Sequence, residues 1–146
     1  MRRRGGPGGF TLIESMVAVG VAGVLAAVAM PGIEGVLHRV RRADAVLAAF
    51  QVQLAQERHR GRASSYGSLA DIGLSSASAG GHYGLEIGAH GADGYDLSVR
   101  ATGVQARDAP CRYLRLRLQG SVPTYASGPD LQVANDAPAN RRCWNR

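Results

Sequence analysis

An apolar run near the start of the chain limits the possible folds more than any other feature. From Phe10 to about Ile33 nearly every residue is apolar, and the exceptions are Thr11, Glu14 and Ser15. An α-helix rises about 1.5 Å per residue, so a run of this length can cross the hydrocarbon core of a membrane. Residues 10–33 are therefore predicted to form a transmembrane helix, and the rest of the 146 residues is enough for one modest domain.

Glu14 is unusual because it places a carboxylate inside this apolar run. A charged side chain in the hydrocarbon core is costly, and an acid found there is by default functional and has a partner. Two alternatives remain open. In the first, Glu14 lies near the membrane surface and its side chain reaches water by snorkelling. In the second, the apolar run is a cleavable secretory signal with "AAVAM" at 26–30 as its cleavage site. A secretory signal gives Glu14 no role.

The charges that flank the run do not fix its orientation in a membrane. Three arginines precede the run, and a histidine and three arginines follow it: Arg2, Arg3 and Arg4, then His38, Arg39, Arg41 and Arg42. Counting positive charges gives only a slight preference for a cytoplasmic amino terminus. The orientation stays open on these grounds.

The residues around Glu14 resemble the amino terminus of type IV prepilins and of the related pseudopilins. A short basic leader, residues 1–9, ends in Gly9, and the sequence "FTLIE" then opens the apolar run. The resemblance covers about residues 5–35. It implies that a prepilin peptidase cleaves after Gly9 and methylates the new amino terminus at Phe10.

The same resemblance implies roles for two further residues. Glu14 stands at the position of the family's key acid, and the hypothesis is that it pairs with the amine of Phe10 on a neighbouring subunit. Opposite charges attract strongly in a low-dielectric core and an unpaired charge is penalised, so the pair would act mainly as a register device. Pro31 stands where the family often has a proline that kinks the helix, because proline removes a backbone donor.

Residues 34–61 are predicted to form an amphipathic helix that continues from the apolar run into the globular domain. From Ile33 onward apolar residues recur three, four or seven positions apart and define one stripe, which consists of Ile33, Leu37, Val40, Leu47, Phe50 and Leu54. One face of a helix covers the sheet in an α+β domain, so this stripe is expected to face the sheet. Gly61 is the predicted end of the helix.

The last part of the chain, residues 62–146, is predicted to contain a small antiparallel sheet. Residues 64–81 are rich in Gly, Ser and Ala and indicate a loop. Apolar and polar residues then alternate in three segments, 82–89, 95–101 and 111–119, and 121–134 adds an edge strand. The predicted fold class is therefore α+β, with a long amino-terminal helix packed on this sheet.

Cys111 and Cys143 are the two cysteines of the chain, and their spacing fits no CxxC motif. If this part of the chain lies outside the cytosol, a disulfide is the default expectation. Such a bond would close a loop of about 30 residues, for which chain entropy gives about 3–4 kcal/mol of stabilisation. The arrangement, with Trp144 directly after the second cysteine, resembles the disulfide-closed region of pilins, most of all the PilE-type minor pilins.

The chain has a formal net charge of +6, and all 17 of its basic residues are arginine. Loss of Arg2, Arg3 and Arg4 with the leader lowers this charge to +3. Nucleic-acid binding is one explanation of this excess of positive charge, and a solvated arginine-rich surface is the other. The scatter of the arginines along the chain favours the solvated surface. The candidate DNA contacts are Arg112, Arg115, Arg117, Arg141 and Arg142.

The sequence contains no catalytic constellation, Gly-rich phosphate loop or metal-ligand spacing, so no enzymatic activity, cofactor or metal is expected. The resemblance implies a structural subunit of a type IV pilus and favours a minor one, with roles in adhesion, twitching motility or DNA uptake. The alternatives are a pseudopilin of a type II secretion system, a DNA-binding competence pilin and a single-span membrane enzyme.

The resemblance also implies partners and a location. The partners are other pilin subunits, the prepilin peptidase, the assembly platform of the inner membrane and, for a competence pilin, DNA. Before assembly the chain would cross the inner membrane once, with its carboxy-terminal domain in the periplasm. After assembly it would be part of an extracellular pilus.

Overall fold

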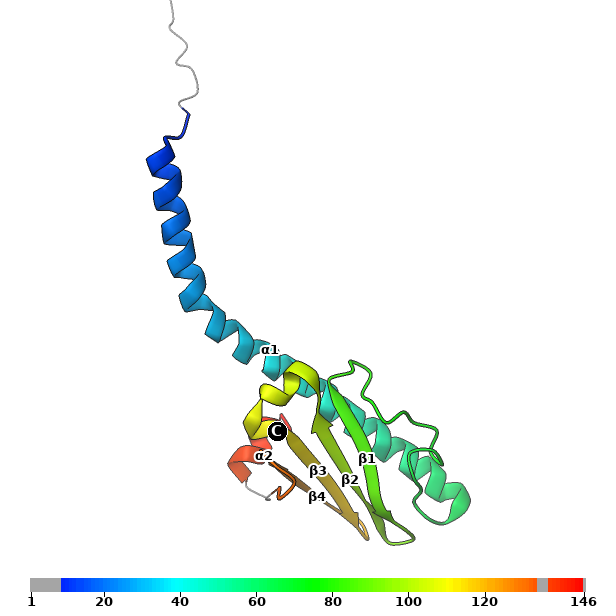
Figure 1. The fold of residues 1–146 in the computed structure, drawn as a ribbon. Coiled ribbons are helices and arrows are strands. Elements are labelled where there is room, and N and C mark those ends of the chain that lie inside the picture. Colours follow the sequence, from blue (N-terminus) through cyan, green and yellow to red (C-terminus); the bar gives the residue numbers. More distant parts are fainter. Residues whose placement is uncertain (1–8, 134–136, 146) are drawn as a thin grey trace, which may run out of the picture. The chain divides into compact units, whose positions relative to one another are not determined.

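The computed structural model describes residues 9–133 and 137–145, apart from the side chains of 29–32 and 137. Its elements are α1 (Leu12–Ala63), β1 (Tyr83–His90), β2 (Gly94–Ala101), the 3₁₀ turns η1 (Gly103–Arg107) and η2 (Ala109–Cys111), β3 (Tyr113–Gln119), β4 (Val122–Gly128) and α2 (Ala137–Cys143), as Figure 1 shows. The chain divides into two compact units, one ending at Leu37 and one beginning at His38.

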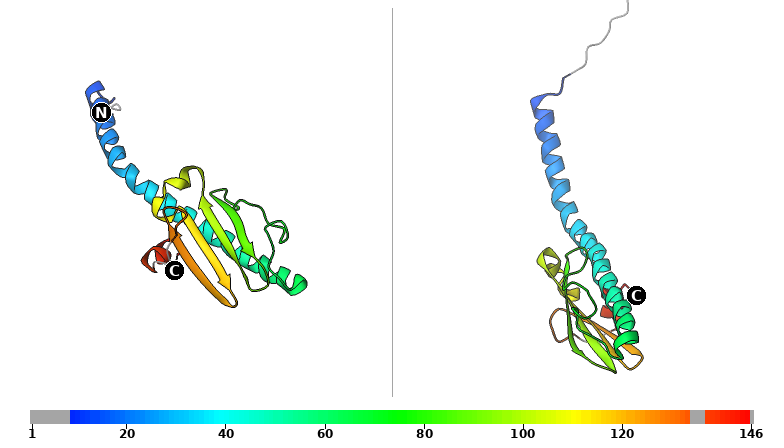
Figure 2. Two further views of the ribbon diagram at one scale, coloured as in Figure 1. Left: turned by 60° about the horizontal axis from the view of Figure 1, so that its bottom comes forward. Right: turned by 90° about the vertical axis from the view of Figure 1, so that its right-hand side faces the viewer.

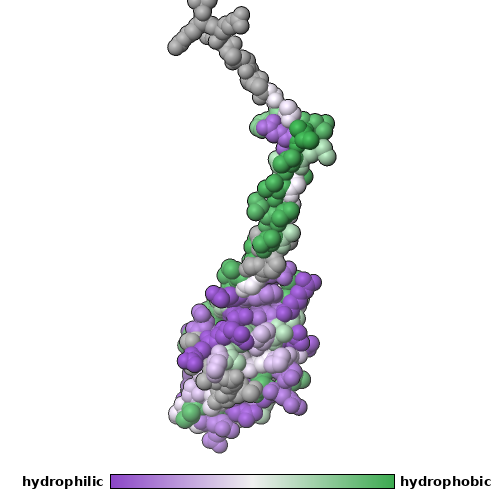
Figure 3. Space-filling model, turned by 90° about the vertical axis from the view of Figure 1, so that its left-hand side faces the viewer, coloured by the Kyte–Doolittle hydropathy of each residue, from purple (hydrophilic) through white to green (hydrophobic). Residues whose placement is uncertain are grey.

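The first unit contains the amino-terminal part of α1. The described apolar side chains of this part are exposed, and Figure 3 shows a mostly hydrophobic surface along this part of the helix. Within the described residues no single helix is both long and apolar enough to cross a membrane, but the segments Leu12–Val28 and Ile33–Ala63 meet that requirement as a pair. The transmembrane segment 10–33 stays a prediction. So does the kink at Pro31, whose side chain lies outside the described part.

The second unit is built on one antiparallel sheet whose strands follow each other in the order β1-β2-β3-β4. Leu97 of β2 lies opposite Ile87 of β1 and Leu116 of β3, and both leucines are fully buried. The alternating apolar residues thus face one side, along which the second half of α1 lies (Figures 1 and 2). The three predicted strands and the edge strand are confirmed, as is the α+β class.

The face of α1 that packs on the sheet is not the predicted one. The buried residues of this half of α1 are Ala45, Ala48, Ala49, Val52 and Gln56, each at most 2% exposed. The predicted stripe is instead 45–64% exposed, at Ile33, Leu37, Val40, Leu47, Phe50 and Leu54. The expectation that this stripe covers the sheet is therefore wrong. Alanines let the helix backbone approach the sheet closely, and bulky side chains on that face would not fit the same close packing.

Gln56 shows how a polar residue is tolerated in this interface. Its amide donates a hydrogen bond to the Gly67 carbonyl at 2.6 Å and accepts one from the Gly67 N–H at 2.9 Å. The buried amide is thus satisfied on both sides. Tyr66, the residue before Gly67, packs against Tyr95, and the centres of the two rings are 5.1 Å apart. These contacts fix the start of the loop between α1 and β1.

Asp44 fixes the end of the same loop. Its carboxylate accepts hydrogen bonds from Ser78 Oγ at 2.6 Å, the Gly80 N–H at 2.9 Å and the His82 N–H at 3.3 Å. Partial burial raises the pKa of Asp44, but these hydrogen bonds lower it by more, so the pKa lies below the ordinary value of 3.8. The ionised carboxylate is therefore the form that holds the loop.

Asp44→Ala is expected to lower the free energy of unfolding near neutral pH by about 1–3 kcal/mol, because three loop donors lose their acceptor. A carboxylate whose pKa is lowered by folding stabilises above its unfolded pKa, and this contribution is lost as the pH falls through the folded value. The difference in the free energy of unfolding between wild type and Asp44→Ala should therefore start to decrease near pH 4 and continue to decrease as the pH falls through the lower folded pKa. Urea unfolding of the full chain in detergent at several pH values measures it. A difference independent of pH would contradict the role of the ionised form.

The disulfide between Cys111 and Cys143 is present, with Cα atoms 5.4 Å apart. It connects the turn η2, just before β3, to α2. The sequence does not predict α2, since seven residues are too few to show a helical period. Trp144 completes this end of the fold. Its ring meets Tyr125 edge to face at 5.0 Å, and its Nε1–H donates to the Ala126 carbonyl at 3.1 Å.

Candidate functional sites

The predicted cleavage and assembly residues lie at the start of α1. Gly9 and Phe10 precede the helix and are exposed, so a peptidase has access to the bond between them. Glu14 and Thr11 form a capping box. The Thr11 N–H donates to Glu14 Oε2 at 3.3 Å, and the Glu14 N–H donates to Thr11 Oγ1 at 3.3 Å. In the single chain the carboxylate of Glu14 therefore caps its own helix, a role additional to the predicted one in assembly.

The exposed apolar residues of α1 in the second unit form a regular row, here called the outer seam: Val40, Ala43, Leu47, Phe50 and Leu54. Successive members are separated alternately by three and four positions, which is the spacing of a helix that packs along another helix. Ala45 and Val52, which face the sheet, lie on the opposite side of α1. α1 thus has two apolar faces, one used inside this chain and one left at its surface.

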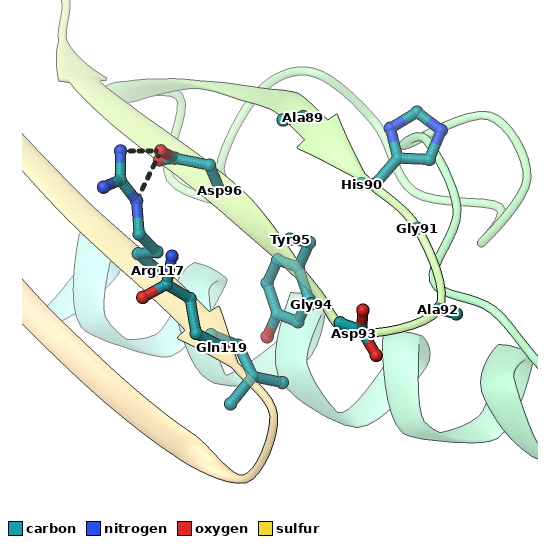
Figure 4. Close-up of a pocket in the computed structure, with 11 residues that line it drawn as sticks. Ala89, His90, Gly91, Ala92, Asp93, Gly94, Tyr95, Asp96, Arg117 and Gln119 are labelled. Atoms are coloured by element: carbon teal, nitrogen blue, oxygen red, sulfur yellow. Dashed lines mark hydrogen bonds and ion pairs between the residues drawn. The ribbon is translucent and has the colours of Figure 1, made fainter.

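The five candidate arginines fall into two groups. Arg115 and Arg117 lie on the face of the sheet away from α1, and both contact Asp96. Arg117 donates to Asp96 Oδ2 from Nε at 3.0 Å and from Nη2 at 2.7 Å, as Figure 4 shows. Arg115 Nε lies 3.2 Å from Asp96 Oδ1, but the two atoms are not aligned for a hydrogen bond. One carboxylate therefore serves two guanidinium groups.

The second group gathers around the disulfide. Arg112 directly follows Cys111, and Arg142 directly precedes Cys143. Arg141 is the neighbour of Arg142 on α2. Arg112 Nε donates to the Ala106 carbonyl at 2.8 Å. None of the three makes an ion pair with a carboxylate of the described residues, so their charges are not neutralised there. These three are called the disulfide-side arginines below.

Surface hollows accompany both groups. A hollow of about 500 Å³ beside Arg112 and Tyr113 adjoins one of about 550 Å³ beside Arg142, and both are lined by Pro129, Asp130 and Gln132. On the sheet face, a further hollow of about 500 Å³ is lined by residues that include His90, Asp96, Arg117 and Gln119 (Figure 4). Within the described part of the chain, no three His, Cys, Asp or Glu side chains gather as metal ligands would.

A buried polar network, which no pattern in the sequence predicts, connects α1 to the turn η1. Arg42 makes a two-pronged ion pair with Asp108, with Nε–Oδ2 at 2.6 Å and Nη2–Oδ1 at 2.8 Å. This hydrogen bonding raises the pKa of the Arg42 guanidinium, against the effect of burial. Gln105 completes the network by donating to Asp108 at 3.2 Å and to the Tyr83 hydroxyl at 3.0 Å. The partners are 66 residues apart, so no local pattern marks them.

Comparison with known families assigns the chain. A family model described as "Type IV minor pilin ComP, DNA uptake sequence receptor" matches residues 34–115, more than half of the chain. The chain belongs to this family. A second model, the prokaryotic N-terminal methylation motif, matches residues 7–30. No curated protein sequence in the comparison matches this minor pilin.

These matches confirm the prediction of a type IV minor pilin with a methylation-type amino terminus. Both models describe pilin features, and neither describes an enzyme. Membership of a pilin family implies assembly with other pilins and membrane anchoring before assembly. The ComP model covers β1, β2 and the start of β3, and so includes Asp96, Arg112 and Arg115. Arg117 and the arginines of α2 lie beyond it.

Proposed function

We propose that this minor pilin serves DNA uptake and binds DNA through its disulfide-side arginines, Arg112, Arg141 and Arg142. The observation that carries the proposal is that the disulfide holds three arginines at one end of the unit without an ion-paired carboxylate among the described residues. Guanidinium groups bind phosphate oxygens in a two-pronged geometry. The family description, a DNA uptake sequence receptor, supports the same ligand.

The proposal includes the path by which the chain reaches the pilus. Prepilin peptidase cleaves between Gly9 and Phe10 and methylates Phe10. Segment 10–33 anchors the chain in the inner membrane, and the second unit lies in the periplasm until assembly. The accessible Gly9–Phe10 bond and the match to the methylation motif support these steps.

The outer seam is the proposed extension of the assembly surface into the second unit. Large apolar side chains at the surface mark contact sites when they form a continuous patch. The seam residues Leu47, Phe50 and Leu54 are each more than half exposed, and their helical spacing fits a helix of another subunit. Assembly through α1 thus leaves the sheet and the disulfide-side arginines free to bind DNA.

Replacing the three disulfide-side arginines by glutamine is expected to weaken DNA binding roughly tenfold or more at 50 mM salt. It should also make the slope of log K against log salt less steep by about 3, because each lost phosphate contact removes about 0.9 from the slope. Fluorescence anisotropy of a labelled short duplex, titrated with the full chain in detergent between 50 and 200 mM salt, measures both quantities.

A matched control removes the same charge elsewhere on the second unit. Arg39, Arg58 and Arg62 are exposed on α1, so their replacement by glutamine changes the net charge equally. This control should lose much less affinity. Equal losses in the two triple variants would show a diffuse charge effect, and weak binding without salt dependence in the wild type would rule out DNA as the ligand.

A further inference from the structure

Asp96 contacts both Arg115 and Arg117 on the face of the sheet away from α1. It alternates along β2 with the buried Tyr95 and Leu97 and therefore points away from α1. In the register it lies opposite Arg117 of β3, and the small Ser98 lies opposite Arg115. Both guanidinium groups reach the same carboxylate, which they shield to 17% exposure, while they themselves stay 36% and 46% exposed.

Asp96, Arg115 and Arg117, here called the trio, use only part of their hydrogen-bonding capacity. Asp96 Oδ2 is engaged by Arg117, whereas Asp96 Oδ1 and Arg115 Nε are close but make no aligned hydrogen bond. Two positive charges against one negative charge leave a net charge of +1 on the trio. An opposite-charge pair across two strands stabilises a sheet modestly, and one arginine is enough for that purpose. The second arginine is not explained by the stability of the sheet.

Two surface hollows are lined in part by Asp96, Arg115 and Arg117. The hollow of about 500 Å³ described above is lined by Asp96 and Arg117. A smaller one of about 170 Å³ is lined by Arg115 and Arg117 together with Thr124, Tyr125, Ala126 and Val133. Figure 4 shows that Arg117 projects from β3 at the border of the larger hollow. The two guanidinium groups are therefore accessible to an anion from outside.

We propose that Asp96 is a built-in counter-ion that competes with DNA phosphate for Arg115 and Arg117. This inference rests on the proposed DNA-binding function and assigns the sheet face a different part from the disulfide-side arginines. With Asp96 in place, a phosphate gains these two arginines only by displacing a carboxylate, so arbitrary DNA gains little there. Asp96 thus limits sequence-independent binding and is a specificity-determining residue.

Asp96→Asn tests this, because it keeps the shape of the side chain and removes its charge. Affinity for a duplex of arbitrary sequence should rise roughly fivefold, the effect of one unit charge a few ångströms from a phosphate in a solvated site. The salt slope should steepen by about 0.9 for each phosphate that the freed arginines neutralise. The same anisotropy titration of the full chain in detergent gives both values.

Glu86→Gln is the matched control. Glu86 is exposed on the same face of the sheet, opposite Ser98, and makes no hydrogen bond or ion pair with the described residues. Its replacement removes the same charge without releasing an arginine. The affinity should therefore rise less than in Asp96→Asn, and the salt slope should not change.

A second comparison does not depend on the folding of Asp96→Asn. In the wild-type background, Arg115→Gln with Arg117→Gln should cost less affinity than Arg112→Gln with Arg141→Gln, because the carboxylate of Asp96 already offsets one of the two charges in the first pair and nothing offsets the second pair among the described residues. If wild type binds DNA but Asp96→Asn binds no tighter, or Glu86→Gln has the same effect, the counter-ion role is overturned and the proposed function stands. If neither wild type nor Asp96→Asn binds DNA at 50 mM salt, both proposals fail.

Discussion

Glu14→Gln should leave cleavage after Gly9 intact and reduce incorporation into pili to a trace. The substitution separates the two roles that the sequence and the structure give to this residue. Glutamine can keep the capping box with Thr11, because its side-chain oxygen still accepts from the Thr11 N–H. It removes the negative charge that is expected to pair with the amine of Phe10 on a neighbouring subunit. Loss of assembly in this variant would therefore be an effect of charge.

The expected effect is large because the pair would form away from water. An unpaired amine left in a low-dielectric core is penalised far more than the same charge at a surface. A mere cap contributes about 1 kcal/mol to its helix, which is too little to abolish assembly. Sheared pilus fractions probed with an antibody against the second unit measure incorporation, and intact mass of the membrane-bound chain confirms cleavage and methylation at Phe10.

Thr11→Ala is the complementary control. It removes the hydroxyl that accepts from the Glu14 N–H and keeps the carboxylate. Incorporation should stay close to that of the wild type. The opposite pattern, in which Thr11→Ala fails and Glu14→Gln assembles, would show that Glu14 acts through its own helix and would discard the pairing hypothesis.

Replacing Cys111 and Cys143 together by alanine should lower the free energy of unfolding by about 3–4 kcal/mol. The disulfide joins residues 32 positions apart, and loop closure of that length gives this value in the chain-entropy model. Both cysteines are fully buried, so the bond also holds α2 and Trp144 against the sheet. Its loss should release the contact of Trp144 with Tyr125 and separate the disulfide-side arginines.

Trp144 is the single tryptophan of the chain, so its fluorescence reports this end of the fold in urea titrations. Reduction of the wild type provides the control, because it breaks the bond and keeps both sulfur atoms in place. Agreement between reduced wild type and the double variant assigns the loss to the cross-link. A loss well below 1 kcal/mol in both would mean that packing alone holds α2.

Several parts of this minor pilin follow from local sequence. The period of two in 82–89, 95–101 and 111–119 marks the strands, because side chains of a strand alternate between its two faces. The motif around Glu14 marks the methylation-type amino terminus, which the family match confirms. The pairing of Cys111 with Cys143 needs no geometry once the chain is taken to be exported, since there are two cysteines.

Other features were decided only by the tertiary structure. α1 has apolar residues on two faces, and periodicity alone marked the bulky face, Leu47 and Phe50, as the one that covers the sheet. The structure packs the alanine face there, because the helix can approach the sheet most closely where its side chains are small.

The electrostatic pairing of the arginines was equally invisible in the sequence. Arg117 meets Asp96 across 21 residues, and Arg42 meets Asp108 across 66. Whether an arginine is neutralised or free therefore depends on strand register and on where a turn is held. The sequence by itself determined the elements and the amino-terminal motif, because these depend on neighbouring residues. The docking face of α1 and the charges left for a ligand depend on contacts between distant residues, which only the folded chain brings together.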